Sequence, residues 1–189
     1  MRPGTEDKGA LLTALARAAI AERFGTSPAR LAHPDWLDAP GAVFVTLSEG
    51  GRLRGCIGSL EAHRSLAEDL LANARAAAFR DPRFPPVQAA ELDHLRVEVS
   101  ILSPAEPMQF TDEADALAQL RPGIDGVILE HGFHRATFLP QVWEQLPDRR
   151  VFIAHLKAKA GLPADFWAPD IRLSRYTVQK YAEASDANA

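Results

Sequence analysis

The clearest candidate for chemistry is Cys56, the only cysteine of the chain, in the stretch Leu53-Arg-Gly-Cys-Ile-Gly-Ser-Leu60. A cysteine acts as a nucleophile in its thiolate form, which a nearby guanidinium favours. Successive side chains of a β-strand alternate between two faces, so Arg54, Cys56 and Gly58 are expected to share one face. The spacing therefore predicts a thiolate beside Arg54, with room at Gly55 and Gly58 for a ligand or another backbone to approach.

A second interpretation, in which Cys56 is packed and unreactive, follows from the same strand geometry. Gly50-Gly51 separate the stretch from Ala42-Val-Phe-Val-Thr-Leu-Ser48, and a Gly-Gly pair between two β-prone runs predicts a hairpin. A two-residue turn there pairs Val45 with Cys56 and surrounds the thiol with apolar side chains. Free cysteines are among the most buried residues of proteins. The sequence leaves a reactive and a structural role both open.

Helices around this stretch are predicted by apolar periodicity and capping signals. An amphipathic helix over residues 9–24 ends at Gly25, and Ser65-Leu-Ala-Glu68 is a capping box that opens an alanine-rich helix to about Arg80. A proline-rich loop is expected at 25–40. Further helices are expected from Thr111 to Leu120, from Pro140, and from Asp148 to Gly161.

Strands are predicted, besides the first hairpin, over residues 96–103, 125–130, 133–139 and 169–181. Two of these form a second hairpin around His131-Gly132. Consecutive antiparallel hairpins flanked by helices define an α+β fold.

Two further segments are placed to reach the Cys56 hairpin. Asparagine is a poor helix former, so Asn73 either faces solvent within its helix or is directed toward the hairpin. The loop Asp81-Pro-Arg-Phe-Pro-Pro86 contains three prolines, each of which fixes φ. Arg83 and Phe84 would then be presented to a ligand with little ordering entropy left to lose. In the alternative, the loop only ends the helix and Phe84 packs inward.

Metal and cofactor sites are weakly indicated. His63 lies beyond the strand of Cys56, so a Cys–His nucleophilic pair is not supported. His131 and His134 lack an identifiable third metal ligand. The glycines of the Cys56 stretch lie inside a strand and do not open a helix as phosphate-binding loops do. No cofactor and no metal are therefore predicted.

Six blocks, in order, cover nearly the whole chain: Leu53-Arg-Gly-Cys-Ile-Gly58, Asp81-Pro-Arg-Phe-Pro-Pro86, Glu98-Val-Ser-Ile-Leu-Ser-Pro104, Gly123-Ile-Asp-Gly126, Ala136-Thr-Phe-Leu-Pro-Gln-Val-Trp143 and Lys159-Ala-Gly-Leu162. Together they resemble the AMMECR family, whose bacterial and archaeal members are called protein A of the AmmeMemoRadiSam system. The first block resembles the family's signature. The resemblance implies a single domain over residues 1–182, built of two intertwined subdomains around a cleft near that signature. It also implies an association, at least genomic, with a Memo-like protein and a radical SAM protein.

Three more candidate residues lie in these blocks. A carboxylate in the middle of a strand, such as Glu98, usually marks the solvated face of an antiparallel sheet. The family pattern carries this glutamate too, which implies a general base or a cation partner. Thr137 in a strand and Gln141 at a helix start are candidate binding residues; the alternative is that they cap and pack around Trp143.

Composition narrows the class of protein. The 189 residues suit one domain, or two small subdomains sharing a core, and the last residues, 183–189, are expected to be a disordered tail. No run approaches a membrane span and no signal peptide is recognisable, so a cytoplasmic protein is expected. The net charge of −4 argues against binding nucleic acid by neutralising phosphates.

Three functions follow as hypotheses. The first is an enzyme, or an enzyme component, acting on a small molecule, with Cys56 as nucleophile, Arg54 beside it, and Glu98 or Asp81 for proton transfer. The second is an adaptor for a Memo-like or radical SAM partner that docks through Arg54, Arg83 and Phe84. The third, least supported by the acidic charge, is a role linked to RNA.

Overall fold

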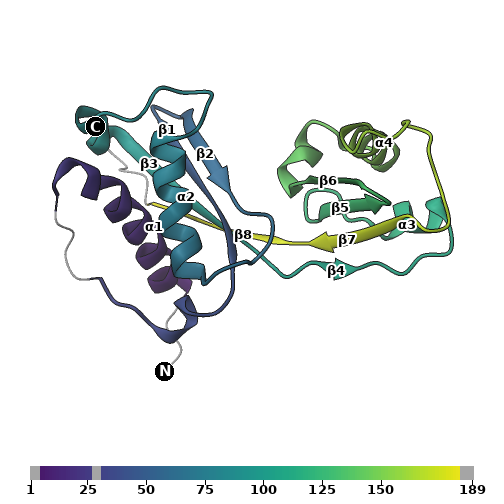
Figure 1. The fold of residues 1–189 in the computed structure, drawn as a ribbon, viewed down its shortest axis with the longest axis horizontal. Helices are drawn as coiled ribbons and strands as arrows, with labels where there is room; N and C mark the ends of the chain where they lie inside the picture. The colour runs from purple at the N-terminus through teal and green to yellow at the C-terminus, as the bar shows by residue number, and fades with distance from the viewer. Residues whose placement is uncertain (1–4, 27–30, 184–189) are drawn as a thin grey trace. The chain divides into compact units, whose positions relative to one another are not determined.

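Two four-stranded sheets, each with an apolar core of its own, organise the chain in the computed structural model, which describes residues 5–26 and 31–183. The first unit comprises Met1–Leu102 and Gln179–Ala189, and the second comprises Ser103–Val178 (Figure 1). The predicted α+β class is confirmed. Among the described residues, none of the helices combines the length and the apolarity needed to cross a bilayer.

The first unit carries a sheet in the strand order β2-β1-β3-β8. Its strands are β1 (Ala42–Glu49), β2 (Arg52–Gly58), β3 (Leu95–Leu102) and β8 (Val178–Ala182). Its helices are α1 (Thr5–Ala21) and α2 (Leu66–Phe79), with short 3-10 turns η1 (Glu22–Phe24), η2 (Asp35–Leu37) and η3 (Ala89–His94). The predicted first hairpin and both predicted helices are confirmed.

Sequence signals explain where these helices begin and end. Gly25 adopts φ 77°, the left-handed conformation that ends a helix, directly after η1. Ser65 and Glu68 form the predicted capping box at the start of α2: the Ser65 hydroxyl accepts from the Glu68 N–H, and the Glu68 carboxylate accepts from the Ser65 N–H. The end of the first helical segment and the start of α2 are thus set by local sequence.

Both α1 and α2 pack on the same face of the first sheet, where they lie side by side (Figure 1). The core between helices and sheet is apolar and includes Leu12, Leu70, Val45 and Val99. Because side chains alternate along a strand, the residues between these core positions point to the opposite face of the sheet. The polar and chemically active side chains of β1, β2 and β3 therefore gather on the face away from α1 and α2.

The hairpin of β1 and β2 has the predicted Gly50-Gly51 turn, with φ 54° and 78° at the two glycines. Its register differs from the prediction, because a β-bulge interrupts the pairing between Leu47 and Ser48. Beyond the bulge, Cys56 pairs with Thr46 and not with Val45. Since a shift by one residue moves a side chain to the other face, the bulge decides what surrounds the thiol.

The second unit holds a sheet in the order β4-β7-β5-β6, namely β4 (Glu106–Pro107), β5 (Gly126–His131), β6 (His134–Phe138) and β7 (Arg172–Tyr176). Its helices are α3 (Glu113–Gln119) and α4 (Arg149–Lys159), and the 3-10 turn η4 (Pro140–Glu144) follows β6 in the chain. Its core centres on Phe152, whose ring stacks on Trp143 at a centroid distance of 3.7 Å. The second predicted hairpin and the helix after Asp148 are confirmed.

Three predictions of detail are corrected. Asp112, and not Thr111, caps α3 by accepting from the Asp115 N–H. The single strand expected over 169–181 is two strands, β7 and β8, which belong to different sheets. Glu183, assigned to a disordered tail, accepts from Arg17 and from the Val97 N–H; residues 184–189 lie outside the described residues.

Candidate functional site

Cys56 lies on β2, the edge strand of the first sheet. Its Sγ is 3.3 Å from the Thr46 hydroxyl oxygen, on the neighbouring strand. The backbone of Cys56 points the other way, to the free edge of β2: its N–H donates to Asp81 Oδ2 at 2.9 Å, and its carbonyl accepts from Arg83 Nη2 at 3.2 Å. Cys56 and Thr46 are therefore a non-hydrogen-bonded pair, the kind that brings side chains closest together.

Asp81 anchors this edge. Its side chain is only 1% exposed, and its carboxylate accepts from the Arg83 guanidinium at 2.7 Å, from the Arg83 N–H, and from the Cys56 N–H. The side-chain hydrogen bond from Arg83 is the main cause that holds the pKa of Asp81 well below its usual range. The bonds from the backbone N–H groups of Cys56 and Arg83 act in the same direction, and burial opposes them. The loop that follows α2 is thus a clamp on the backbone of Cys56.

The arginine beside Cys56 is Arg83, and the predicted neighbour Arg54 is held elsewhere. Arg54 is the extra residue of the bulge, and its guanidinium makes two hydrogen bonds, 2.7 and 3.1 Å, to Glu91 of η3. The pKa of Arg83 is raised by its hydrogen bonds to Asp81, against the opposing effect of burial. The bulge interrupts the regular alternation on which the predicted same-face pairing of Arg54 with Cys56 was based.

The two glycines of the motif are explained by neighbours within the protein. A Cβ at Gly55 would collide with the backbone carbonyl of Ala77 in α2, and a Cβ at Gly58 would collide with the Phe44 ring. The expected open space at Gly58 is filled by that ring, and the backbone that approaches Gly55 belongs to α2. The glycines therefore allow close packing of the hairpin, and they leave no vacancy for a ligand.

A row of three side chains crosses the sheet at Cys56. Thr46 pairs with Cys56 on one side and with Glu98 on the other, so thiol, hydroxyl and carboxylate lie on adjacent strands of the same face. Neighbours in such a row have Cβ atoms about 4.5–5.5 Å apart. Lys180 of β8 extends the row, with Nζ 3.9 Å from Glu98 Oε1. We call Cys56, Thr46, Glu98 and Lys180 the thiol row.

Asn73 takes the orientation toward the hairpin that the sequence left open. Its amide donates to the Val43 carbonyl at 3.1 Å, to the Ser59 hydroxyl and to Asp69. Asp69, 2% exposed, also accepts from the Val43 N–H, Ser59 and Arg64. Sequence reasoning missed Asp69, although an acidic residue directly after a capping-box Glu, one helical turn before Asn73, marks the same helix face.

Phe84 is half-buried, and the Arg83 guanidinium lies 5.4 Å from its ring centre. Arg83 is itself 53% exposed. The loop therefore combines both interpretations offered by the sequence: Phe84 packs partly inward, while Arg83 is presented at the surface.

Thr137 and Gln141 belong to the second unit, whereas the thiol row belongs to the first. The Thr137 hydroxyl is 3.1 Å from the Tyr176 hydroxyl, which also donates to the Phe138 carbonyl. Burial raises the pKa of Tyr176. Gln141 is exposed on η4. Thr137 is thus hydrogen-bonded to a residue of its own unit.

Histidines form no metal centre in residues 5–26 and 31–183, where no group of three His, Cys, Asp or Glu side chains is placed to hold an ion. His63 is 3.3 Å from Glu61, His131 is 3.2 Å from Asp170, and His134 contacts the Ala160 carbonyl.

Fold and site define a two-unit α+β protein whose single thiol is clamped at the edge of one sheet. The chain belongs to the AMMECR1 family, whose model matches residues 13–181. A protein of Methanothermobacter thermautotrophicus is 42% identical over 186 residues, 96% of this chain and 97% of its own length. Protein MJ0810 of Methanocaldococcus jannaschii is 38% identical over 188 residues, 97% of this chain and 94% of its own.

A solved structure has the same fold. The crystal structure of protein PH0010 from Pyrococcus horikoshii matches with a TM-score of 0.80 and 36% identity, covering 95% of this chain and 93% of that one. None of these relatives carries a name that assigns it an activity, so the function has to be argued from the site.

Stability should depend on the charge of Asp81. The folded-state pKa lies below the unfolded value of about 3.9. The clamp therefore stabilises the protein above that pH, and its contribution should disappear as the pH falls further. Asp81→Asn should lower the free energy of unfolding at pH 7 by about 1–3 kcal/mol and flatten its acid dependence. Urea unfolding from pH 7 to 3 measures both.

The exposed Asp165, which has no side-chain partner among the described residues, provides the control. Asp165→Asn should leave both the stability and its pH dependence close to wild type. An Asp81→Asn protein as stable as wild type at pH 7 would show that the clamp is energetically unimportant.

Substitution of Gly55 and Gly58 by alanine should show which neighbouring group excludes a side chain at each position. Gly55→Ala should destabilise by at least about 2 kcal/mol, because the Ala77 carbonyl is part of a helix backbone and cannot rotate away. Gly58→Ala should cost less in a Phe44→Leu background than in wild type, whereas the cost of Gly55→Ala should not depend on Phe44. Denaturant unfolding of the double-mutant cycle tests this; equal coupling at both glycines would refute it.

Proposed function

We propose that the thiol row is the reaction site of an enzyme, or enzyme component, that acts on a small molecule. The observation that carries the proposal is the alignment of Cys56, Thr46 and Glu98 on one face of three adjacent strands, with Thr46 within 3.3 Å of the sulfur. A nucleophile, a hydroxyl and a carboxylate that lie side by side are the groups that nucleophilic catalysis with proton transfer requires.

The face on which the row lies supports this use. The helices α1 and α2 cover the other side of the sheet, and neither contributes a side chain to the row. Cys56, Thr46 and Glu98 are each partly exposed, so water and small reagents have access to part of each side chain. The backbone of Cys56 is held from its free edge by Asp81 and Arg83, which keeps the sulfur in place beside Thr46.

The row suggests a reaction that needs no cofactor. The Cys56 sulfur adds to an electrophilic carbon, such as a carbonyl carbon, and the electron pair of the broken π bond moves to the oxygen. The thiol proton passes to the Thr46 hydroxyl, whose own proton passes to Glu98. Lys180, at 3.9 Å from Glu98, offsets the negative charge of that carboxylate before the proton arrives. Arg83 holds the backbone of Cys56 from the strand edge through the Cys56 carbonyl.

The setting we propose is the cytoplasm, in association with a Memo-like protein and a radical SAM protein. What supports it is membership of the AMMECR1 family. The acidic net charge of −4 disfavours a role that depends on binding RNA.

Alkylation of the folded protein tests whether the thiol is reactive. Iodoacetamide at neutral pH should modify Cys56 without denaturant, and Arg83→Ala should slow the modification several-fold because it removes the positive charge bonded to the Cys56 carbonyl. Arg83→Lys, which retains the charge, should restore part of the rate. Arg52→Ala, an exposed arginine on the same strand, should leave it unchanged. Mass spectrometry with time provides the rates.

The variant Arg54→Ala tests whether Arg83, and not Arg54, is the arginine that affects the reactivity of Cys56. Because Arg54 is bonded to Glu91, its removal should leave the alkylation rate within about two-fold of wild type, provided that circular dichroism shows a folded protein. Modification of Cys56 only after unfolding would reject the proposed reaction site. A rate that falls with Arg54→Ala and not with Arg83→Ala would reject the assignment of Arg83.

A second candidate function is an adaptor that docks through the loop after α2. The exposed Arg83 and the adjacent Phe84 ring are the combination of side chains often found at interface anchors, whereas Arg54, with 12% of its side chain exposed, is unsuited to that role. Tagged protein should then retain a co-expressed Memo-like or radical SAM protein, and Phe84→Ala should weaken that retention at least ten-fold. Retention of neither protein would rule out this adaptor function.

A further inference from the structure

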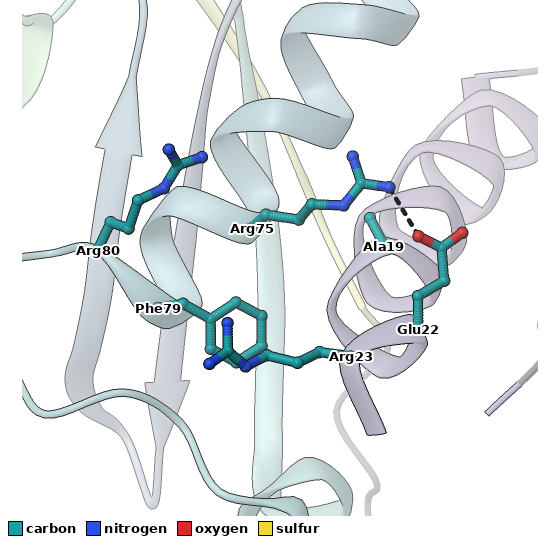
Figure 2. Close-up of a pocket in the computed structure, with 6 residues that line it drawn as sticks. All are labelled: Ala19, Glu22, Arg23, Arg75, Phe79 and Arg80. Atoms are coloured by element: carbon teal, nitrogen blue, oxygen red, sulfur yellow. Dashed lines mark hydrogen bonds and ion pairs between the residues drawn. The ribbon is translucent and has the colours of Figure 1, made fainter. Parts of the chain in front are cut away.

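A second feature of the first unit, separate from the thiol row, is a hollow where α1 and α2 end. It has a volume of about 540 Å³ and is lined by Ala19, Glu22, Arg23, Arg75, Phe79 and Arg80 (Figure 2). Three of these six residues are arginines. The volume lies within the roughly 300–1,000 Å³ typical of small-molecule sites. None of the lining residues belongs to the motif around Cys56.

The guanidinium groups of the hollow have many free hydrogen-bond donors. Each guanidinium carries five N–H donors. Arg75 donates to Glu22 at 2.7 Å, and among the described residues neither Arg23 nor Arg80 has a side-chain hydrogen bond to the protein. Most of the donors are therefore available to a ligand with several acceptor oxygens.

Two of the arginines are ordered before any ligand arrives. The Arg23 guanidinium lies over the Phe79 ring, 4.7 Å from its centre, and the Phe79 ring is itself packed edge-on against Phe24. Arg75 reaches across from α2 to Glu22 on the neighbouring turn, as Figure 2 shows. Fixing a long side chain in advance reduces the entropy that a ligand's binding would otherwise cost.

The net charge of the hollow favours an anion. Three guanidiniums and one carboxylate leave a formal charge of about +2, and each of the two helix ends contributes about −0.5. The hollow thus stays positive by about one unit even with the helix ends included. The partial negative charge of the two helix ends would favour one or two arginines nearby. Three arginines around one hollow exceed what those ends require.

We propose that this hollow binds the phosphate group of a small molecule. A phosphate carries nearly two negative charges and three acceptor oxygens, which match several guanidiniums better than the two oxygens of a carboxylate do. The hollow is larger than a phosphate, so the rest of the molecule has room beside Arg23, whose stacked guanidinium offers its outer face to a planar group. This site is independent of the proposed reaction at Cys56.

Titration calorimetry with sodium pyrophosphate at low ionic strength tests the proposal on the full chain. Wild type should bind one equivalent, and Arg80→Ala should weaken binding at least ten-fold. Arg80 has no side-chain partner to lose, so this variant should stay folded. Glu22→Gln should change affinity in the opposite direction, strengthening it several-fold, because it removes the one competing carboxylate.

Arg52→Ala removes an exposed arginine outside the hollow and serves as the charge-matched control. It should leave pyrophosphate binding unchanged. No binding to wild type, or an equal loss in Arg80→Ala and Arg52→Ala, would overturn the proposal. Binding of a single-stranded oligonucleotide without any binding of pyrophosphate would also overturn it, in favour of a polymer-binding surface.

Discussion

The carboxylate of Asp81, buried against the edge of β2, is the contact on which the Cys56 site depends. An edge strand presents N–H and C=O groups that no neighbouring strand pairs, and such an edge can pair with another chain unless it is covered or blunted. Here two side chains make the hydrogen bonds that a neighbouring strand would otherwise make. Asp81 accepts from the N–H of Cys56, and its ion-pair partner Arg83 donates to the carbonyl of the same residue. One loop thereby completes the backbone bonding at the position of the thiol.

The helix α2 connects this clamp to the rest of the first unit. Near its start, Asp69 and Asn73 bond to the backbone of Val43 on β1. Near its end, the Ala77 carbonyl packs against Gly55 on β2, and the chain then turns directly into Asp81. The helix is therefore attached to β1 by hydrogen bonds and to β2 by close backbone packing, as well as by its apolar face. A displacement of α2 along its axis would disturb the backbone on both sides of Cys56.

Much of this architecture could be predicted from local signals. The Gly50-Gly51 turn, the capping box at Ser65 and the cap at Asp148 act within a few residues, so the sequence shows them directly. The bulge at Arg54 could not be predicted, because no turn or capping signal in the neighbouring residues marks it. Once the register shifted by one residue, the predicted neighbours of Cys56 changed: Thr46 replaced Val45, and Arg83 replaced Arg54. The division of 169–181 into strands of two sheets likewise depends on tertiary structure.

The return of β8 to the first sheet has a consequence for the order in which the protein is made. The second unit, Ser103–Val178, interrupts the first, and the two connecting segments are joined by the hydrogen bond from the Ser103 N–H to the Thr177 carbonyl. On the ribosome, β1, β2 and β3 emerge long before β8, while all strands of the second sheet emerge in between. The second unit can thus fold first, whereas the outer edge of β3 has to wait uncovered until the last strand is synthesised.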